Sequence, residues 1–312
     1  MNKTNKVQRA SLRNRISIEW KKHWCLYIMI IPLILYYFIF HYIPMFGLVI
    51  SFQNYTPSRG IWGSDFVGLK NFAAFFGSPY FWQLLRNTVR ISTTQLLFSF
   101  PAPIVLALLI NEIRSKRFRQ VTQTLSYLPH FISLAVVCGM IKDFTLDTGI
   151  INDIVTFFGG ERQSMLTNPK LFVPIYIVSD IWQHLGWNSI IYISALAGID
   201  QQLYEAAQID GATKWKQMIH VTLPGIIPTI IIMLLLKIGQ ILNVGFEKII
   251  LLYNPLTYET ADVLSSFIYR RGLQDFNWGY STAAGMFNSV INTLLLIAAN
   301  KISSKTSETA LW

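Results

Sequence analysis

Polar and aromatic side chains interrupt two of the most apolar stretches of the chain. In the first stretch they are spaced by three or four residues, so that in a helix they share one face: Asp180, Gln183, His184 and Trp187, with Asn188 next to them. Carboxylate, amide and imidazole groups can hydrogen-bond the rim of a polyhydroxylated solute, and an indole ring can stack on its apolar faces. This stretch therefore predicts the lining of a polar path through an apolar environment.

The second stretch carries Lys237, Gln240 and Asn243 at intervals of three residues, which also predicts one shared helix face. Other roles stay open for single members, because a tryptophan such as Trp187 can anchor a helix at the membrane interface and an amide can bond a neighbouring helix. A charge at membrane depth is costly and usually faces a cavity or a partner. Asp180 and Lys237 are therefore expected to pair with each other or to meet acidic groups on a second membrane protein.

The remaining reactive residue types give no pattern for catalysis or metal binding. The five histidines have no metal-ligand spacing, no Ser-His-Asp grouping can be argued, and no GxxxxGK[ST] loop is present. The two cysteines, Cys25 and Cys138, lie inside apolar runs and predict neither a disulfide nor a metal site. We predict no catalytic residue, no metal ligand and no cofactor bound by this chain.

The composition is that of a membrane protein. Of 312 residues, 52% are hydrophobic and only 13% are charged, about half the charged share of a soluble domain. The net charge of +10 comes from short basic clusters beside apolar runs. This placement favours the positive-inside bias of a protein surrounded by membrane lipid, and it disfavours a nucleic-acid partner.

Apolar runs of roughly 20 residues predict an all-α, polytopic protein with about six transmembrane helices. The expected spans are 24–50, 87–110, 121–141, 171–196, 225–244 (with 252 as an alternative end) and 280–299. The first is read as a retained helix, because the basic region before it and the run itself are too long for a cleavable signal peptide. The chain then divides into a basic segment at 1–23, a membrane domain at 24–300 and a tail at 301–312.

Orientation follows from lysine and arginine near the spans. The segment 1–23 and the link at 111–120 are strongly basic, and the loops at 51–86, 142–170 and 253–279 are longer and less basic. Both termini are therefore expected in the cytoplasm, together with the segment 199–224.

The cytoplasmic segment 203–224 reads as two short helices. Residues 204–209 have helix-forming composition, Asp210-Gly211 is a turn signal, and Thr213 can cap a second helix that stops at Leu223-Pro224. An amphipathic connector lying on the bilayer is the plain alternative.

The full pattern of this segment resembles the EAA loop of permease subunits from binding-protein-dependent ABC importers. That family shows Glu-Ala-Ala, three residues, Gly, nine residues, Ile, any residue and Leu-Pro. The chain matches it at Glu205, Ala206, Ala207, Gly211, Leu223 and Pro224, and departs only by Val221 for Ile. The resemblance implies that this loop, with Asp210 in its turn, docks on the ATPase subunit and couples ATPase closure to the membrane helices.

Weaker resemblances cover most of the chain from Leu26 to Ala299. Val67–Phe72 and Asn87-Thr88 are similar to carbohydrate-uptake permeases, and Tyr127–Ser133 is similar to the branch that imports oligosaccharides and polysaccharide fragments. In this family sugar contacts lie roughly 18 to 25 residues ahead of the EAA glutamate, a window that holds Asp180, Gln183, His184 and Trp187.

The resemblance implies the permease fold of a type I ABC importer in the bacterial cytoplasmic membrane, forming half of a translocation pathway for a sugar. It implies a second permease subunit, usually a homologous different chain, together with an extracytoplasmic solute-binding protein. It also implies two ATPase subunits that carry ATP and Mg, so the chain itself is not an enzyme. A non-sugar cargo such as phosphate, an amino acid or a peptide stays open, Lys237 keeps an acidic saccharide open, and an ion-driven secondary transporter is the rival from another class.

Overall fold

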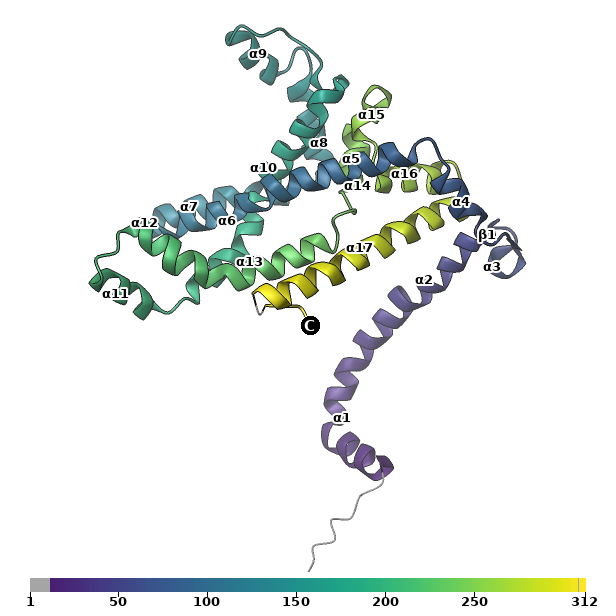
Figure 1. Ribbon diagram of the computed structural model, residues 1–312, viewed down its shortest axis with the longest axis horizontal. Coiled ribbons are helices and arrows are strands. Elements are labelled where there is room, and N and C mark those ends of the chain that lie inside the picture. The colour runs from purple at the N-terminus through teal and green to yellow at the C-terminus, as the bar shows by residue number, and fades with distance from the viewer. Residues whose placement is uncertain (1–11, 308) are drawn as a thin grey trace, which may run out of the picture.

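The computed structural model describes residues 12–307 and 309–312, so residues 1–11 of the basic segment predicted at 1–23 lie outside the described backbone. Its first span is one long rod that contains several helix types. The rod consists of the part of α1 (Leu12–Tyr37) that follows a kink at His23, a π-helical turn (Phe38–Tyr42), α2 (Ile43–Met45) and a 3₁₀ helix (Phe46–Phe52). None of its most apolar window is buried against the rest of the chain, and Figure 1 shows it leaning away from the other helices. Apart from its 3₁₀ end, which contacts α17 and α4, the rod leaves most of its apolar surface open to lipid or to another protein.

The second and third spans both contain breaks. The second is straight enough to count as one helix from Phe81 to Asn111, built from α5 (Phe81–Thr94), a π turn (Gln95–Ser99) and α6 (Pro101–Asn111). The third was predicted as one helix over 121–141, and this is wrong. It consists of α7 (Lys116–Tyr127), a 3₁₀ turn (Leu128–Phe131) and α8 (Leu134–Thr145), with a bend of 94°.

The bend has a local cause. Pro129 has no backbone N–H and ends the regular helix, and Ser133 starts the next one by accepting a hydrogen bond from the Val136 N–H at 3.4 Å.

The last three spans are α10 (Pro169–Ala197), α13 (Leu223–Ile238) and α17 (Trp278–Thr306). In the part of the chain that the structure describes, four helices are long and apolar enough to cross a membrane, and the bent pair makes a fifth. Helix α10 has 29 residues, about 43 Å of helix, and is long enough for a sixth. Its polar residues lower its hydropathy. The all-α polytopic fold is confirmed, whereas the predicted end of the fifth span at 244 is wrong, because α13 stops at Ile238.

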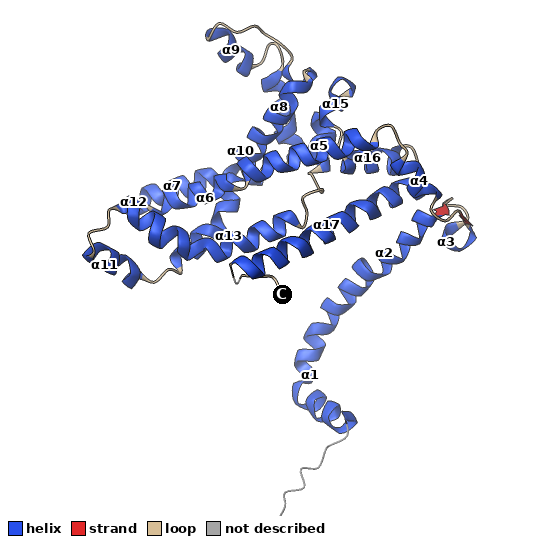
Figure 2. Cartoon of the chain, in the orientation of Figure 1, coloured by secondary structure: helices blue, strands red, loops and turns tan. Residues whose placement is uncertain are grey.

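Short elements occupy the connections, as Figure 2 shows. They are β1 (Gln53–Asn54) and β2 (Asp65–Phe66), which pair antiparallel, α3 (Gly60–Gly63), α4 (Lys70–Phe76), α9 (Ile150–Phe157), a 3₁₀ turn (Met165–Thr167), α11 (Gln201–Ile209), α12 (Lys214–Gln217), a π turn (Met218–Thr222), α14 (Phe246–Leu252), a 3₁₀ turn (Pro255–Thr257), α15 (Tyr258–Ala261), α16 (Leu264–Tyr269) and a π turn (Arg270–Gln274).

Helix α10 is the centre of the packing, since it touches α6, α7, α13 and α15. One apolar cluster joins its first half to α14 through Phe172, Tyr176 and Ile249, all of which are buried. A second cluster joins its last half to α6 and α13 through Ala107, Tyr192 and Ile226. The polar face of α10 is therefore held at a fixed angle to α6 and α13.

Candidate functional site

A cavity of about 380 Å³ lies between α6, α10 and α13, inside the apolar part of the molecule. Five residues predicted from the sequence line it: Asp180, His184, Asn188, Lys237 and Gln240. The three from α10 are spaced by four residues, so the face that meets the cavity is narrower than predicted. The lining also includes Tyr192, a polar aromatic residue of the same stretch as Asp180, and Ser99, which the sequence did not identify because it is a single polar group in an apolar run.

Opposite charges face this cavity without forming an ion pair with each other. Asp180 pairs with His184, whose Nδ1 lies 3.4 Å from Oδ1, and the Gln95 side chain donates to Asp180 Oδ2 at 3.4 Å. Among the described residues no ion pair joins Asp180 to Lys237, so the direct pairing considered above is not formed. The Lys237 ammonium and the Asp180 carboxylate are both lining groups, which gives the cavity one cationic and one anionic side.

Three predicted path residues lie outside the cavity lining. Gln183 is 4% exposed and sits within the packing, while Trp187 stacks on His130 with ring centroids 4.4 Å apart and planes 5° apart. Asn243 accepts hydrogen bonds from the side chains of Asn288 at 2.7 Å and Asn292 at 3.3 Å.

The prediction that Lys237, Gln240 and Asn243 share a helix face is wrong, because the helix ends at Ile238 and the chain turns. Gln240 still reaches the cavity from this turn, whereas Asn243 bonds to α17.

A buried cation was also missed. Lys248 in α14 is 4% exposed, its Nζ donates to the Tyr176 carbonyl at 3.3 Å, and it lies 5.0 Å from the centroid of the Tyr176 ring. The carbonyl and the ring partly replace the water that a lysine loses on burial. Only tertiary contacts identify this site, because in the sequence Lys248 looks like the exposed end of an apolar run.

The loop at 203–224 has the turn that its sequence predicts. Helix α11 ends in a left-handed glycine, Gly211, with φ of +73°, and the Ala212 N–H bonds the Ala207 carbonyl at 2.9 Å. The next helix is capped by Thr213, whose hydroxyl accepts from the Lys216 N–H at 3.4 Å. Nothing lies within 4 Å of a Cβ built on Gly211, so the glycine is required by its backbone angle alone.

The predicted stop at Leu223-Pro224 is wrong, because Lys214–Ile238 is one continuous helix of 25 residues. Pro224 occupies one of the first two positions of α13 after a π turn, where its missing N–H does no harm. The second half of the loop and the fifth span are therefore one rod.

The loop exposes both charged and apolar side chains, which are the groups through which a helix can contact another protein. Glu205, Ala206 and Asp210 are exposed, and Ile209 has 87% of its surface open although it is apolar. The hydroxyls of Tyr204 and Thr222 lie 3.0 Å apart and join α11 to the base of α13. A force on α11 thus has a direct contact through which it reaches the fifth span.

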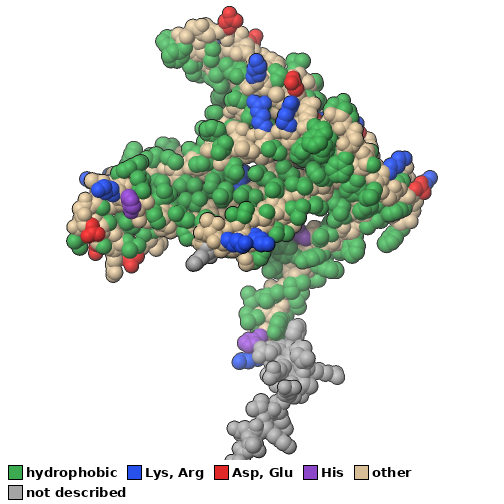
Figure 3. Space-filling model, in the orientation of Figure 1, with side chains coloured by type: hydrophobic (Ala, Val, Ile, Leu, Met, Phe, Trp, Pro, Cys, Tyr) green, Lys and Arg blue, Asp and Glu red, His purple; other side chains and the backbone are tan. Residues whose placement is uncertain are grey.

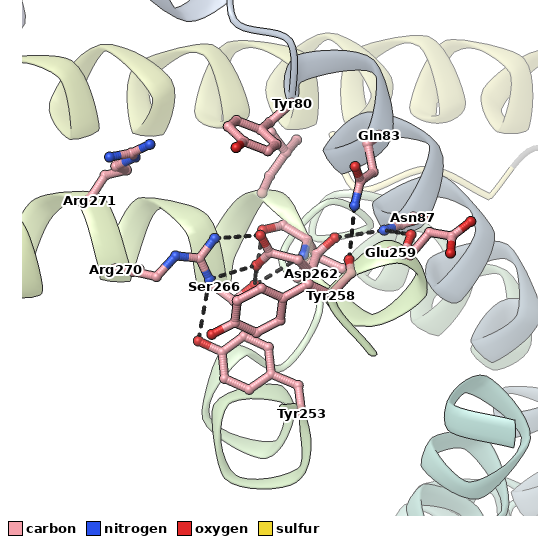
Figure 4. A network of polar contacts seen from close by, with 12 residues as sticks. Tyr80, Gln83, Asn87, Tyr253, Tyr258, Glu259, Asp262, Ser266, Arg270 and Arg271 are labelled. Carbon is pink, nitrogen blue, oxygen red and sulfur yellow. Dashed lines mark hydrogen bonds and ion pairs between the residues drawn. The ribbon is translucent and has the colours of Figure 1, made fainter. Parts of the chain in front are cut away.

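A network of polar contacts fastens the 253–271 loop to the start of α5, as Figure 4 shows. Asp262 is 5% exposed and pairs with Arg270, with Nη2 and Oδ2 2.5 Å apart. Burial acts to lower the pKa of Arg270, but the hydrogen bonds and charge of Asp262 outweigh it and hold that pKa above its ordinary value. The Asn87 side chain donates to the backbone carbonyls of Glu259 at 2.9 Å and Asp262 at 3.0 Å. The Asp262–Arg270 pair and Asn87 of α5 therefore hold the 253–271 loop against α5.

Comparison with known proteins agrees with this architecture. Residues 99–308 match the family model described as binding-protein-dependent transport system inner membrane component. The polygalacturonan/rhamnogalacturonan transport system permease protein YteP of Bacillus subtilis is 42% identical over 96% of this chain and 94% of its own length. Protein LplB of the same organism is 42% identical over 95% of this chain and 94% of its own.

Solved structures are equally similar. A chain of a bacterial ABC transporter involved in the import of the acidic polysaccharide alginate superimposes with a TM-score of 0.87 at 44% identity, covering 94% of this chain and 99% of that one. A chain of the alginate transporter in complex with a periplasmic protein bound to alginate pentasaccharide gives 0.88 at 44% identity, covering 95% and 100%. The chain belongs to the family of inner membrane components of binding-protein-dependent transport systems, and it is a transport permease, not an enzyme.

Proposed function

We propose that this chain forms half of the translocation pathway of an ATP-driven importer for an acidic oligosaccharide or polysaccharide fragment. The observation that carries the proposal is the cavity between α6, α10 and α13, where Lys237 and Gln240 face Asp180 and Asn188 within an apolar bundle. A uronic-acid oligomer offers carboxylates to the lysine and hydroxyls to the amides and the aspartate. The relatives named for polygalacturonan and alginate support this class of cargo, because both polymers are acidic.

A second permease subunit completes the pathway. The first span has no buried residue in its most apolar window, which leaves a whole helix available for a neighbouring chain. In the proposal a single chain lines only part of the pathway, with a cavity formed by α6, α10, α13 and the turns that carry Ser99 and Gln240. In the proposal the second subunit is a homologous different chain, and an extracytoplasmic solute-binding protein delivers the sugar.

Two ATPase subunits, which carry the ATP and Mg, dock on the α11 side of the molecule. Closure of the ATPases moves α11, and the Tyr204–Thr222 contact passes this movement to the helix that begins at Lys214. Because that helix is continuous to Ile238, its far end carries Lys237 into or out of the cavity. The chain thus couples ATP hydrolysis elsewhere to a change in its own lining.

In this proposal the basic link at 111–120, the loop at 203–224 and both chain termini lie on the same side of the membrane, in the cytoplasm of a bacterium. Spin labels or impermeant thiol reagents at residue 62 and residue 215 would test this topology. Labelling at 62 only from outside and at 215 only from inside is expected, and the reverse would overturn the orientation.

The decisive experiment is purification of the chain with its partner subunits, followed by ATPase measurement with the cognate binding protein. Uronic-acid oligomers are expected to stimulate hydrolysis, and neutral oligomers of equal length are not. Replacement of Lys237 by Gln removes one charge-assisted hydrogen bond, about 1.5 to 3 kcal/mol, and should raise the oligomer concentration for half-maximal stimulation by roughly 10- to 150-fold.

Recovery of no ATPase subunit would overturn the importer assignment. Equal stimulation by neutral and acidic oligomers, with an unchanged response in the Lys237→Gln variant, would leave a sugar importer but overturn the acidic cargo. Stimulation only by phosphate, amino acids or peptides would overturn the sugar cargo itself.

A further inference from the structure

Helix α9, in the 142–170 connection, presents an apolar face that the rest of the described chain leaves open. Ile150, Ile154, Phe157 and Phe158 are 57%, 54%, 84% and 81% exposed. Their spacing of four, three and one residues puts them on one side of the helix. The two phenylalanine rings contact each other edge to face, 5.4 Å apart between centroids. A patch of this kind in a short loop needs an apolar environment.

The opposite face of α9 is polar and fixes the orientation of the helix. Asn152 is fully buried, and its side-chain N–H groups donate to the carbonyls of Leu146 at 2.6 Å and Gln163 at 2.8 Å. Arg162 pairs with Asp153 at 2.5 Å across the same hairpin. The apolar face is therefore presented by a preformed hairpin and does not depend on a chance conformation of a loose loop.

The apolar face continues into a groove of about 460 Å³ between α8, α9 and α10. Its lining is almost wholly apolar and includes Val137, Ile141, Ile151, Ile175, Val178 and Trp182. The residues that α10 contributes here lie on the side of the helix away from Asp180 and His184, so the groove faces outward from the polar cavity. In Figure 3 hydrophobic side chains cover one edge of the projection that carries α9, and acidic side chains lie at its tip.

We propose that α9 lies in the interface of the bilayer, with Ile150, Ile154, Phe157 and Phe158 inserted below the lipid headgroups. This inference rests on the proposed function in one respect only: the membrane orientation proposed there places α9 on the outer side of the bilayer. The exposed Asp153–Arg162 pair lies at the flank of this face, at the level of the headgroups, and Asn152 lies on the opposite face. The groove beside Ile151 extends the same lipid contact along α8 and α10.

A lipid surface fits this face better than a protein partner. Protein interfaces carry about one hydrogen bond per 100 to 200 Å², and this face offers only aliphatic and aromatic carbon. Its continuity with the outward groove of two membrane-embedded helices also points to lipid, since the same solvent covers both surfaces.

Site-directed spin labelling of the complete transporter in lipid nanodiscs tests the proposal. Cys25 and Cys138 are first replaced by Ala, and Phe158→Cys is compared with Glu161→Cys, an exposed position on the same hairpin. The label at 158 should collide more with oxygen than with a water-soluble nickel chelate, and the label at 161 should show the reverse. Phe157→Cys provides a second position if the first variant does not assemble.

Equal access of the nickel chelate to labels at 158 and 161 would overturn the proposal. A label at 158 that is immobilised and shielded from both reagents would assign the face to a protein neighbour, and shielding only after the binding protein is added would assign it to that protein. None of these readouts depends on transport. A failure of the sugar-import assignment therefore leaves the result on α9 interpretable.

Discussion

The turn at Gly211 allows the coupling role that we propose for the 203–224 loop to be tested by backbone strain alone. Its φ of +73° lies in the left-handed region, and no atom lies within 4 Å of a Cβ built there. Gly211→Ala therefore introduces no clash within the chain. It forces an L-residue into the left-handed region, at a cost of about 1 to 2 kcal/mol. The population of the native turn relative to its competitors should fall by roughly 5- to 30-fold.

Gly211→Asn separates strain from a clash with a docked partner. Asparagine is larger than alanine but tolerates the left-handed region better. If strain controls coupling, the amount of sugar imported per ATP should decrease from the native protein to the Asn variant and further to the Ala variant. If the ATPase surface closes tightly over position 211, the larger Asn should be worse than Ala.

The assay is parallel measurement of ATP hydrolysis and sugar uptake by the full complex in proteoliposomes. Gly285→Ala is the matched control, because that glycine also has nothing within 4 Å of its Cβ position but lies inside helix α17. It should leave the ratio of uptake to hydrolysis unchanged. Native coupling in both Gly211 variants would refute the reasoning, and a larger loss in Asn than in Ala would replace backbone strain with steric exclusion as the cause.

Two further predictions concern stability. In Gly186→Ala the new Cβ would lie 2.1 Å from the Ser126 carbonyl oxygen, a backbone atom that cannot rotate away. We expect the free energy of unfolding to fall by about 1 to 3 kcal/mol, seen as a lower thermal midpoint than in Gly285→Ala. An unchanged midpoint would contradict the close contact of α7 and α10. Asp262→Asn leaves the Arg270 guanidinium without its negatively charged partner. We expect the free energy of unfolding to fall by about 3 kcal/mol, toward the low end for a buried pair because the Arg270 side chain is 21% exposed. Adding Arg270→Gln should then cost less than it does in the native protein, and strict additivity in a double-mutant cycle would argue against the pair.

Features set by local chemistry were predictable from the sequence. The turn at Asp210-Gly211 and the cap at Thr213 follow from residue types that few other conformations favour, and both are present. The polar face of α10 was also predictable, since Asp180 and Asn188 stand out in an apolar run. The loop pattern and these faces were sufficient to indicate a permease.

Features set by tertiary contacts were not predictable. Asp262 and Arg270 are eight residues apart in a loop that reads as polar, and only the fold buries them against α5. Lys248 is similar, because its partner is a backbone carbonyl of Tyr176 in another helix. A carbonyl acceptor leaves no trace in the sequence.

The end of α13 shows why polar residues in an apolar run are ambiguous. A helix that breaks inside a membrane exposes backbone groups that lipid cannot satisfy, so neighbouring helices must supply partners. Here the Asn292 side chain accepts from the Leu242 N–H at 3.1 Å, and the Ser92 hydroxyl donates to the Ile241 carbonyl.

Asn243 is part of the polar contacts that stabilise the broken helix, because its side chain accepts a hydrogen bond from Asn292 and does not line the cavity. The same break turns Gln240 toward the cavity, so one interruption of the helix produces both a lining residue and a structural one. The spacing of the amide residues alone predicted that both Gln240 and Asn243 line the solute path. Whether the backbone beside each residue is still helical distinguishes the two roles. Polar residues next to a helix break should therefore be read first as partners for the freed backbone, and as ligands for the solute only when a cavity remains beside them.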